Sequence, residues 1–165
     1  MEKLKLFNGT VCEVMNLATG KCLVRDYVGE VNEVYQYELQ DIPLSRELLE
    51  HLGFRFDAVD YRIKGWECYR LTKIRRVYLS PSFFVEEEMY TPLIGYTITA
   101  DGEKRFSIFT RKYIDNRIGT CRVKNLNEFL YLCECLGFRV KVDVEKLNAF
   151  MRQQDNVSRY VLITK

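Results

Sequence analysis

Side chains suited to acid–base chemistry are scarce in this chain. Histidine occurs once, as His51, in a segment whose apolar spacing predicts a short helix. Glu47 lies one helical turn before it, so the preferred interpretation is a surface ion pair between the two. A histidine-based triad stays open as an alternative, because its members need not be near one another in sequence. We therefore predict no catalytic residue, and an enzyme, such as a hydrolase or nuclease, is the least favoured function.

The cysteines show no spacing typical of a metal site. Cys133 and Cys135 are two residues apart, which directs their thiols to different sides of a helix, whereas structural zinc needs four convergent ligands. Both lie near the predicted C-terminus of that helix, where the helix dipole disfavours a thiolate. We expect Cys133 in the core, Cys135 partly exposed, and all thiols reduced. No metal is predicted.

Cofactor motifs are missing as well. The sequence contains neither a glycine-rich phosphate loop nor a dinucleotide fingerprint. Glu86, Glu87 and Glu88 are consecutive, and three consecutive acids cannot all face one ion in regular structure, so we predict a solvated loop that leaves the core after Val85. No cofactor is expected.

Charge is distributed unevenly along the chain. Residues 26–50 carry seven acidic side chains and one arginine, whereas residues 61–80 carry six basic and one acidic, and residues 103–124 seven basic and two acidic. If the two basic segments are neighbouring strands, their outward faces would form one positive surface with tyrosines that can stack on bases. This predicted basic and aromatic binding surface comprises Arg62, Lys64, Arg70, Lys73, Arg75, Arg76, Tyr78, Lys104, Arg105, Arg111, Lys112 and Tyr113.

Two interpretations of this polarity remain open. The basic strands could bind RNA or DNA, or they could neutralise the acidic N-terminal third across a sheet. The second is favoured, because a pI near 8.2 is low for a dedicated nucleic-acid domain. No RNA-recognition, KH or helix-turn-helix pattern changes that balance.

The elements that must position these residues are mostly strands. Alternating and β-branched residues predict a hairpin over 10–16 and 21–28, a third strand through 34–39, and further strands within 54–79, which Ser80-Pro81-Ser82 ends. Asp101-Gly102 predicts a hairpin turn between strands 93–99 and 104–110. We also predict a short strand at 140–142 and a closing strand at 160–164.

Helix caps predict the remaining elements. Ser45, Asn125 and Asp143 stand before apolar residues at helical spacing, and Gly53 and Gly137 are expected to end the first two helices. Both of those ends read Leu-Gly-Phe-Arg, for which a shared helix-ending motif is favoured over an internal duplication. The predicted fold class is α+β, a mostly antiparallel sheet with two or three short helices.

Length and composition predict a single α+β domain over residues 1–165. The chain is 47% hydrophobic and 29% charged, with 11 Tyr and 10 Phe and a formal charge of +2, which excludes collagen-like and mostly disordered proteins. It has neither an apolar leader nor a run of about 18 apolar residues. A cytoplasmic location without membrane contact is therefore expected.

The segment from Asp41 to Phe54 resembles a pattern in small uncharacterised proteins of bacteriophages and mobile elements from gut-type bacteria. The pattern combines an Ile-Pro-Leu helix start, a Leu-Leu helix and a Gly-Phe end with a later helix like that over 123–132. The resemblance implies a phage-type accessory or counter-defence protein.

Together these features favour a non-enzymatic binding protein. We expect it to inhibit or modulate a host or defence-system protein or ribonucleoprotein by docking a charged, tyrosine-rich face, since interfaces favour Tyr and Arg. Direct binding of RNA or DNA is the alternative.

Overall fold

The computed structural model describes residues 3–18, 20–60, 66–71, 73–89, 93–109 and 121–164. The chain forms two compact units that interleave along the sequence. Unit 1 comprises Met1–Pro43, Asn125–Tyr131 and Lys141–Lys165, and unit 2 comprises Leu44–Lys124 and Leu132–Val140. The α+β class with mostly antiparallel sheets is confirmed. A single cooperative domain over 1–165 stays a prediction.

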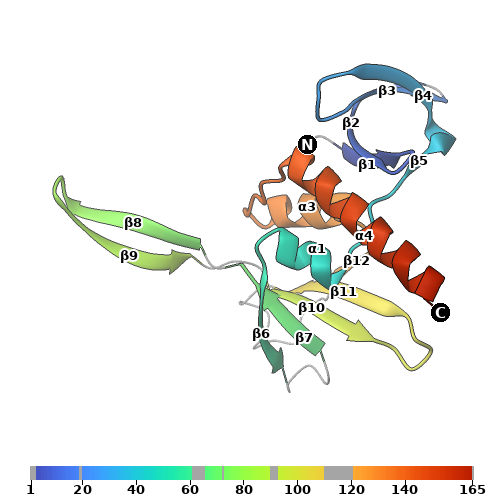
Figure 1. Cartoon of the computed structure of the whole chain (residues 1–165). Helices are drawn as coiled ribbons and strands as arrows, with labels where there is room; N and C mark the ends of the chain where they lie inside the picture. Colours follow the sequence, from blue (N-terminus) through green and yellow to red (C-terminus); the bar gives the residue numbers. More distant parts are fainter. Residues whose placement is uncertain are drawn as a thin grey trace. The chain divides into compact units, whose positions relative to one another are not determined.

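Unit 1 is built on a five-stranded antiparallel sheet that Figure 1 shows strongly curled. Its strands are β1 (Lys3–Phe7), β2 (Thr10–Ala18), β3 (Lys21–Arg25), β4 (Val31–Tyr35) and β5 (Leu39–Gln40), in the order β4-β3-β2-β1-β5. The inner face buries Cys12, Cys22, Val24 and Val34, since alternate residues of a strand point to the same side. The predicted first hairpin is therefore confirmed, and β1 is a strand that the sequence did not reveal.

Helical segments of unit 1 are tied to this sheet by two asparagines. Asn127, in the first part of α3 (Leu126–Cys135), accepts a hydrogen bond from the Leu4 amide at 2.9 Å and donates one to the Leu4 carbonyl at 2.7 Å. Asn148, buried on α4 (Val144–Thr164), accepts one from the Val11 amide at 3.1 Å. These bonds satisfy buried backbone groups that would otherwise be costly to desolvate.

Unit 2 contains a second five-stranded antiparallel sheet. Its strands are β6 (Arg55–Asp60), β7 (Trp66–Arg70), β10 (Leu93–Ile98), β11 (Lys104–Phe109) and β12 (Cys121–Val123), in the order β12-β11-β10-β7-β6. The Asp101-Gly102 hairpin is confirmed, with Gly102 at a φ of +83°. The helix α1 (Arg46–His51) begins where predicted, because the Ser45 hydroxyl accepts the Leu48 amide at 3.0 Å.

The repeated Leu-Gly-Phe-Arg is a shared helix-ending motif. Gly53 and Gly137 adopt positive φ angles of +97° and +77°, and each following phenylalanine amide bonds back to the helix, Phe54 to the Leu49 carbonyl at 3.0 Å and Phe138 to that of Cys133 at 2.8 Å. Both phenylalanines are buried. Glycine is favoured here because only it adopts this conformation without strain.

Four sequence predictions are wrong in detail. The strand predicted through 34–39 ends at Tyr35 and gives way to a 3₁₀ helix, η1 (Gln36–Glu38), because the Glu38 carboxylate accepts the Tyr35 amide at 2.9 Å. Residues 138–143 form no strand, since no strand edge pairs with them. The predicted closing strand at 160–164 continues α4, because a helix capped at Asp143 gains one hydrogen bond per added residue. Glu86, Glu87 and Glu88 lie in a strand and not in a loop.

Candidate functional site

Strands β8 (Lys73–Ser80) and β9 (Phe83–Met89) form a sheet of their own within unit 2. Figure 1 shows the two strands, in green, paired with each other and joined at one end. Pro81 and Ser82 form that turn, so the predicted end of the strand at Ser80 is correct. Among the described residues, no third strand pairs with either edge. We call residues 73–89 the β8–β9 hairpin.

The cross-strand register places charged pairs at one end of the hairpin and apolar pairs at the other. Arg75 opposes Glu87 and Arg76 opposes Glu86, whereas Val77 opposes Val85 and Tyr78 opposes Phe84. Because side chains alternate, one face carries the Arg75–Glu87 ion pair and the two valines. The other carries the Arg76–Glu86 pair, with 3.6 Å between Nε and Oε1, and the two aromatic rings.

The aromatic face is internally ordered. The Arg76 guanidinium lies 4.4 Å from the centre of the Phe84 ring, and the Tyr78 and Phe84 rings are 5.5 Å apart and tilted by 54°. An exposed cation–π contact contributes about 0.5–1 kcal/mol, and a cross-strand aromatic pair about 0.2–1 kcal/mol. The surface is therefore pre-arranged although no other element covers it among the described residues.

Five large apolar side chains are exposed around the turn of the hairpin. Leu79 is 65% exposed and Phe83 58%, and Tyr78, Phe84 and Val85 are exposed as well. Isolated exposed apolar residues are ordinary, but several large apolar side chains exposed around one turn indicate an interaction surface. We call these five residues the apolar tip.

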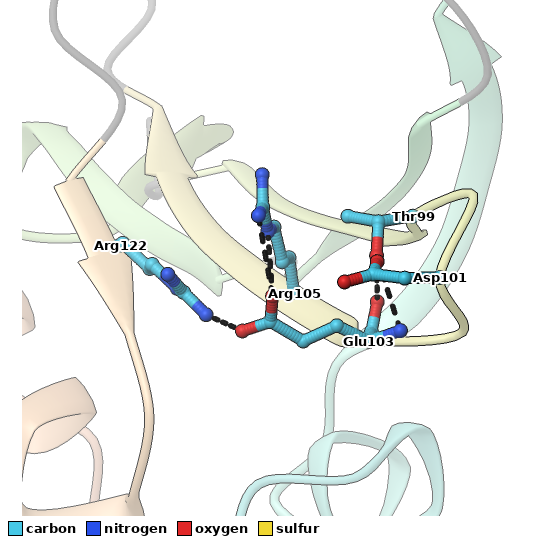
Figure 2. A network of polar contacts seen from close by, with 5 residues as sticks. All are labelled: Thr99, Asp101, Glu103, Arg105 and Arg122. Atoms are coloured by element: carbon cyan, nitrogen blue, oxygen red, sulfur yellow. Dashed lines mark hydrogen bonds and ion pairs between the residues drawn. The ribbon is translucent and has the colours of Figure 1, made fainter.

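The basic strand β11 belongs to a different arrangement, drawn in Figure 2. Glu103 accepts from Arg105 at 3.2 Å and also pairs with Arg122 of β12. Across the turn, the Thr99 hydroxyl accepts the Glu103 amide at 3.1 Å and contacts Asp101, whose carboxyl pKa is lowered, chiefly by that Thr99 contact. Two of the basic side chains of residues 103–124 thus share one carboxylate.

The structure separates the predicted basic and aromatic residues. Arg70 lies on β7, Lys73, Arg75, Arg76 and Tyr78 lie on β8, and Lys104 and Arg105 lie on β11. In the sheet of unit 2, strand β10 lies between β7 and β11, and β8 belongs to the two-stranded sheet that it forms with β9. The described strands of the two basic segments are therefore not neighbours. Arg62, Lys64, Arg111, Lys112 and Tyr113 lie outside the described residues.

The described ion pairs also differ from the favoured prediction, in which the basic strands neutralise the acidic N-terminal third. Arg75, Arg76, Arg105 and Arg122 pair with glutamates of their own sheets and not with the acidic segment 26–50. That segment's Glu33 and Asp41 pair instead with Lys21 and Lys5 of the N-terminal sheet. An ion pair from Arg46 to Glu67 joins the acidic and basic segments.

Arg46 and Glu67 belong to a polar cluster on the sheet of unit 2. The two side chains are 3.4 Å apart, the Tyr69 hydroxyl donates to the Glu67 carboxylate at 3.2 Å, and the Arg46 guanidinium lies 5.0 Å from the Tyr96 ring centre. Burial and the Glu67 charge raise the Tyr69 pKa to about 12, and Glu67 also raises the pKa of Arg46. Tyr69 therefore stays protonated at neutral pH, as a hydrogen-bond donor that holds Glu67 toward the first residue of α1.

Two buried thiols have raised pKa values, which disfavour the reactive thiolate. Burial raises the pKa of Cys133 to about 12, and burial with the Asp26 charge raises that of Cys12 to about 11. Cys133 is buried and Cys135 exposed, as predicted. In the described part of the chain, no three His, Cys, Asp or Glu side chains are grouped closely enough to hold a metal ion. Within that same part, no helix has the length and apolarity needed to cross a membrane.

The sequence reasoning missed the apolar tip. Leu79, Phe83, Phe84 and Val85 were absent from the predicted surface, although Phe83-Phe84-Val85 directly follows a Ser-Pro-Ser turn. A turn flanked on both sides by large apolar residues is the signal that could have indicated them. Comparison with protein-family models, curated proteins and solved structures finds no match, so the resemblance to phage-type proteins stays untested.

Proposed function

We propose that this chain is a non-enzymatic binding protein that docks on a partner protein through the β8–β9 hairpin. The observation that carries the proposal is the apolar tip, five large apolar side chains exposed at the end of a two-stranded sheet. An isolated hairpin is marginally stable in water. Binding a partner would bury these side chains and add the contacts that the hairpin lacks.

The composition of the hairpin supports a protein partner. Interface centres favour aromatic residues and arginine, surrounded by polar groups that exclude water. Tyr78, Phe83 and Phe84 supply the aromatic part, and the two arginine–glutamate pairs would form the rim. Because each arginine already has a carboxylate partner, the rim is nearly neutral and favours neither an acidic nor a basic surface.

The kind of partner, and what binding does to it, follow from the sequence resemblance alone. On that basis the partner is a host or defence-system protein or ribonucleoprotein of a gut-type bacterium, which this phage-type accessory protein inhibits or modulates. The cytoplasm, where such complexes act, is the proposed location.

Direct binding of RNA or DNA is the competing function. It requires arginines that can exchange counterions for phosphates. Arg75, Arg76, Arg105 and Arg122 each contact a glutamate, so phosphate binding would first have to break an ion pair. The described charges therefore favour the protein partner.

The proposal is tested by affinity capture from a nuclease-treated lysate of a gut-type bacterial host. Wild-type protein should retain one stoichiometric protein at low and moderate salt. The double variant Leu79→Ser/Phe83→Ser should retain at least about tenfold less, since truncated anchor residues each cost more than 1 kcal/mol of binding. The control Ile98→Ser changes a residue of similar exposure, 55%, on β10 and should retain the wild-type amount.

Two outcomes would contradict the proposal. Wild-type protein could capture no stoichiometric protein, or the double variant could capture as much as wild type. Circular dichroism of the three proteins separates a docking defect from misfolding.

A further inference from the structure

Unit 1 exposes a stacked pair of tyrosines at the junction of β4 and η1. The rings of Tyr35 and Tyr37 are 5.4 Å apart and nearly parallel, at 12°. Tyr37 is 81% exposed, the highest exposure among the large apolar and aromatic side chains of the described residues. Tyrosines that stack on each other and remain this exposed present a flat aromatic surface to solvent.

Carboxylates flank the stacked pair. The Glu38 side chain folds back to accept the Tyr35 amide at 2.9 Å, which holds its charge beside the rings. Residues 26–43 contain five acidic and no basic side chains. Glu33 and Asp41 pair with Lys21 and Lys5, while Asp26 accepts the backbone amides of Val28 and Glu30 within its own turn.

The protein already places one cation on this surface. The Lys21 ammonium lies 5.3 Å from the centre of the Tyr35 ring and 3.2 Å from a Glu33 carboxylate oxygen. An ammonium group is thus accommodated by one tyrosine face and one carboxylate together. Tyr37 and Glu38, which come next in η1, offer the same two kinds of group, an aromatic ring and a carboxylate.

We propose that Tyr35, Tyr37 and Glu38 bind an arginine- or lysine-rich segment of a partner protein. The ring quadrupole attracts a cation over its face, and arginine also stacks flat on an aromatic ring. The excess of carboxylates in residues 26–43 complements a basic segment and repels an acidic one. These residues belong to unit 1 and the β8–β9 hairpin belongs to unit 2, and the inference does not depend on the function proposed for the hairpin.

The test titrates the ¹⁵N-labelled full chain with N-acetylated, C-amidated hexa-arginine and follows the amide signals. Signals of residues 21, 33 and 35–38 should shift. Tyr37→Ala should weaken binding about three- to fivefold, as expected for an exposed cation–π contact, and Tyr37→Phe should retain most of it. Lys21→Ala removes the internal competitor and should tighten binding about twofold.

Two matched control variants test whether hexa-arginine binds at Tyr35, Tyr37 and Glu38 and not elsewhere on the chain. Tyr78→Ala removes an exposed tyrosine of the hairpin, and Glu47→Gln removes an exposed carboxylate of α1, so both should leave hexa-arginine binding unchanged. Equal losses in Tyr37→Ala and Glu47→Gln would reduce the effect to general charge attraction and overturn the proposal. So would shifts confined to signals outside residues 21–38, or tighter binding by hexa-glutamate.

Discussion

The hairpins β8–β9 and β10–β11 are alike in several respects but differ in what covers them. Both are antiparallel, both carry arginine–glutamate ion pairs, and both contain paired aromatic rings. The β10–β11 hairpin is flanked by β7 and β12 and buries Ile94, Tyr96, Phe106 and Ile108. The β8–β9 hairpin has no flanking strand among the described residues and exposes its apolar tip.

This difference teaches that similar strand chemistry can serve two purposes. On β10–β11 the aromatic residues stabilise the fold, because their contact with the core removes apolar surface from water. On β8–β9 the corresponding surface remains in water, where it contributes little to folding, and under the proposed function a partner protein would bury it. A residue's role is therefore decided by its neighbours and not by its type.

The largest expected difference between the two hairpins is in the free energy of unfolding that is lost when a ring of each aromatic pair is removed. Phe106→Ala removes a ring that is 4% exposed and lies 4.9 Å from Tyr96, and it should lower the free energy of unfolding by about 3–5 kcal/mol. Phe84→Ala removes the equivalent ring of the other hairpin together with its contacts to Arg76 and Tyr78, and should cost about 1–2 kcal/mol. Urea unfolding of both variants measures the contrast, and equal losses would show that the β8–β9 hairpin is part of a core.

An effect of intermediate size is expected in an alkaline titration, which follows the ionisation of tyrosine side chains by absorbance. One tyrosine absorbance step should appear near pH 12 and vanish in Tyr69→Phe, because burial and Glu67 raise the pKa of this residue on β7. The raised pKa implies that its contribution to stability is complete below pH 10, the ordinary tyrosine value, and is lost as the pH rises toward 12. Loss of the step in Tyr78→Phe, with Tyr69→Phe unchanged, would reverse this assignment.

Ion pairs should produce the smallest effect. Glu103→Gln removes the charge shared by Arg105 and Arg122, and Glu87→Gln removes one partner of a single exposed pair. Since exposed pairs contribute about 0–1 kcal/mol, we expect about 0.5 kcal/mol for the first and less for the second. Thermal unfolding at low and high salt measures both, and a larger loss in Glu87→Gln would contradict the comparison.

Local signals explain which parts of the fold the sequence could predict. The caps at Ser45, Asn125 and Asp143 and the turn at Asp101-Gly102 are decided by neighbouring residues, so they were predicted correctly. The strand wrongly predicted at 160–164 depends on whether a partner edge exists, which no local pattern encodes.

The candidate site shows the same limit. Arg75, Arg76 and Tyr78 belong to the predicted basic and aromatic surface, which requires the basic segments to be neighbouring strands. Among the described residues, β8 pairs with β9 alone. Phe83 and Phe84 read as ordinary strand residues until the hairpin is seen to lack a covering layer among the described residues. The large apolar residues beside the Ser-Pro-Ser turn could have indicated a site. They could not show that these side chains stay exposed, because exposure depends on the packing of other segments.

Site-specific photo-crosslinking tests the central claim most directly. A benzoylphenylalanine at position 83 places the reactive group on the apolar tip, and one at position 98 places it on β10 at similar exposure, 58% against 55%. In nuclease-treated lysate of a gut-type bacterial host, we expect position 83 to crosslink to one discrete protein and position 98 to yield none. Equal crosslinking from both positions, or none from position 83, would contradict the assignment of the hairpin as the docking surface.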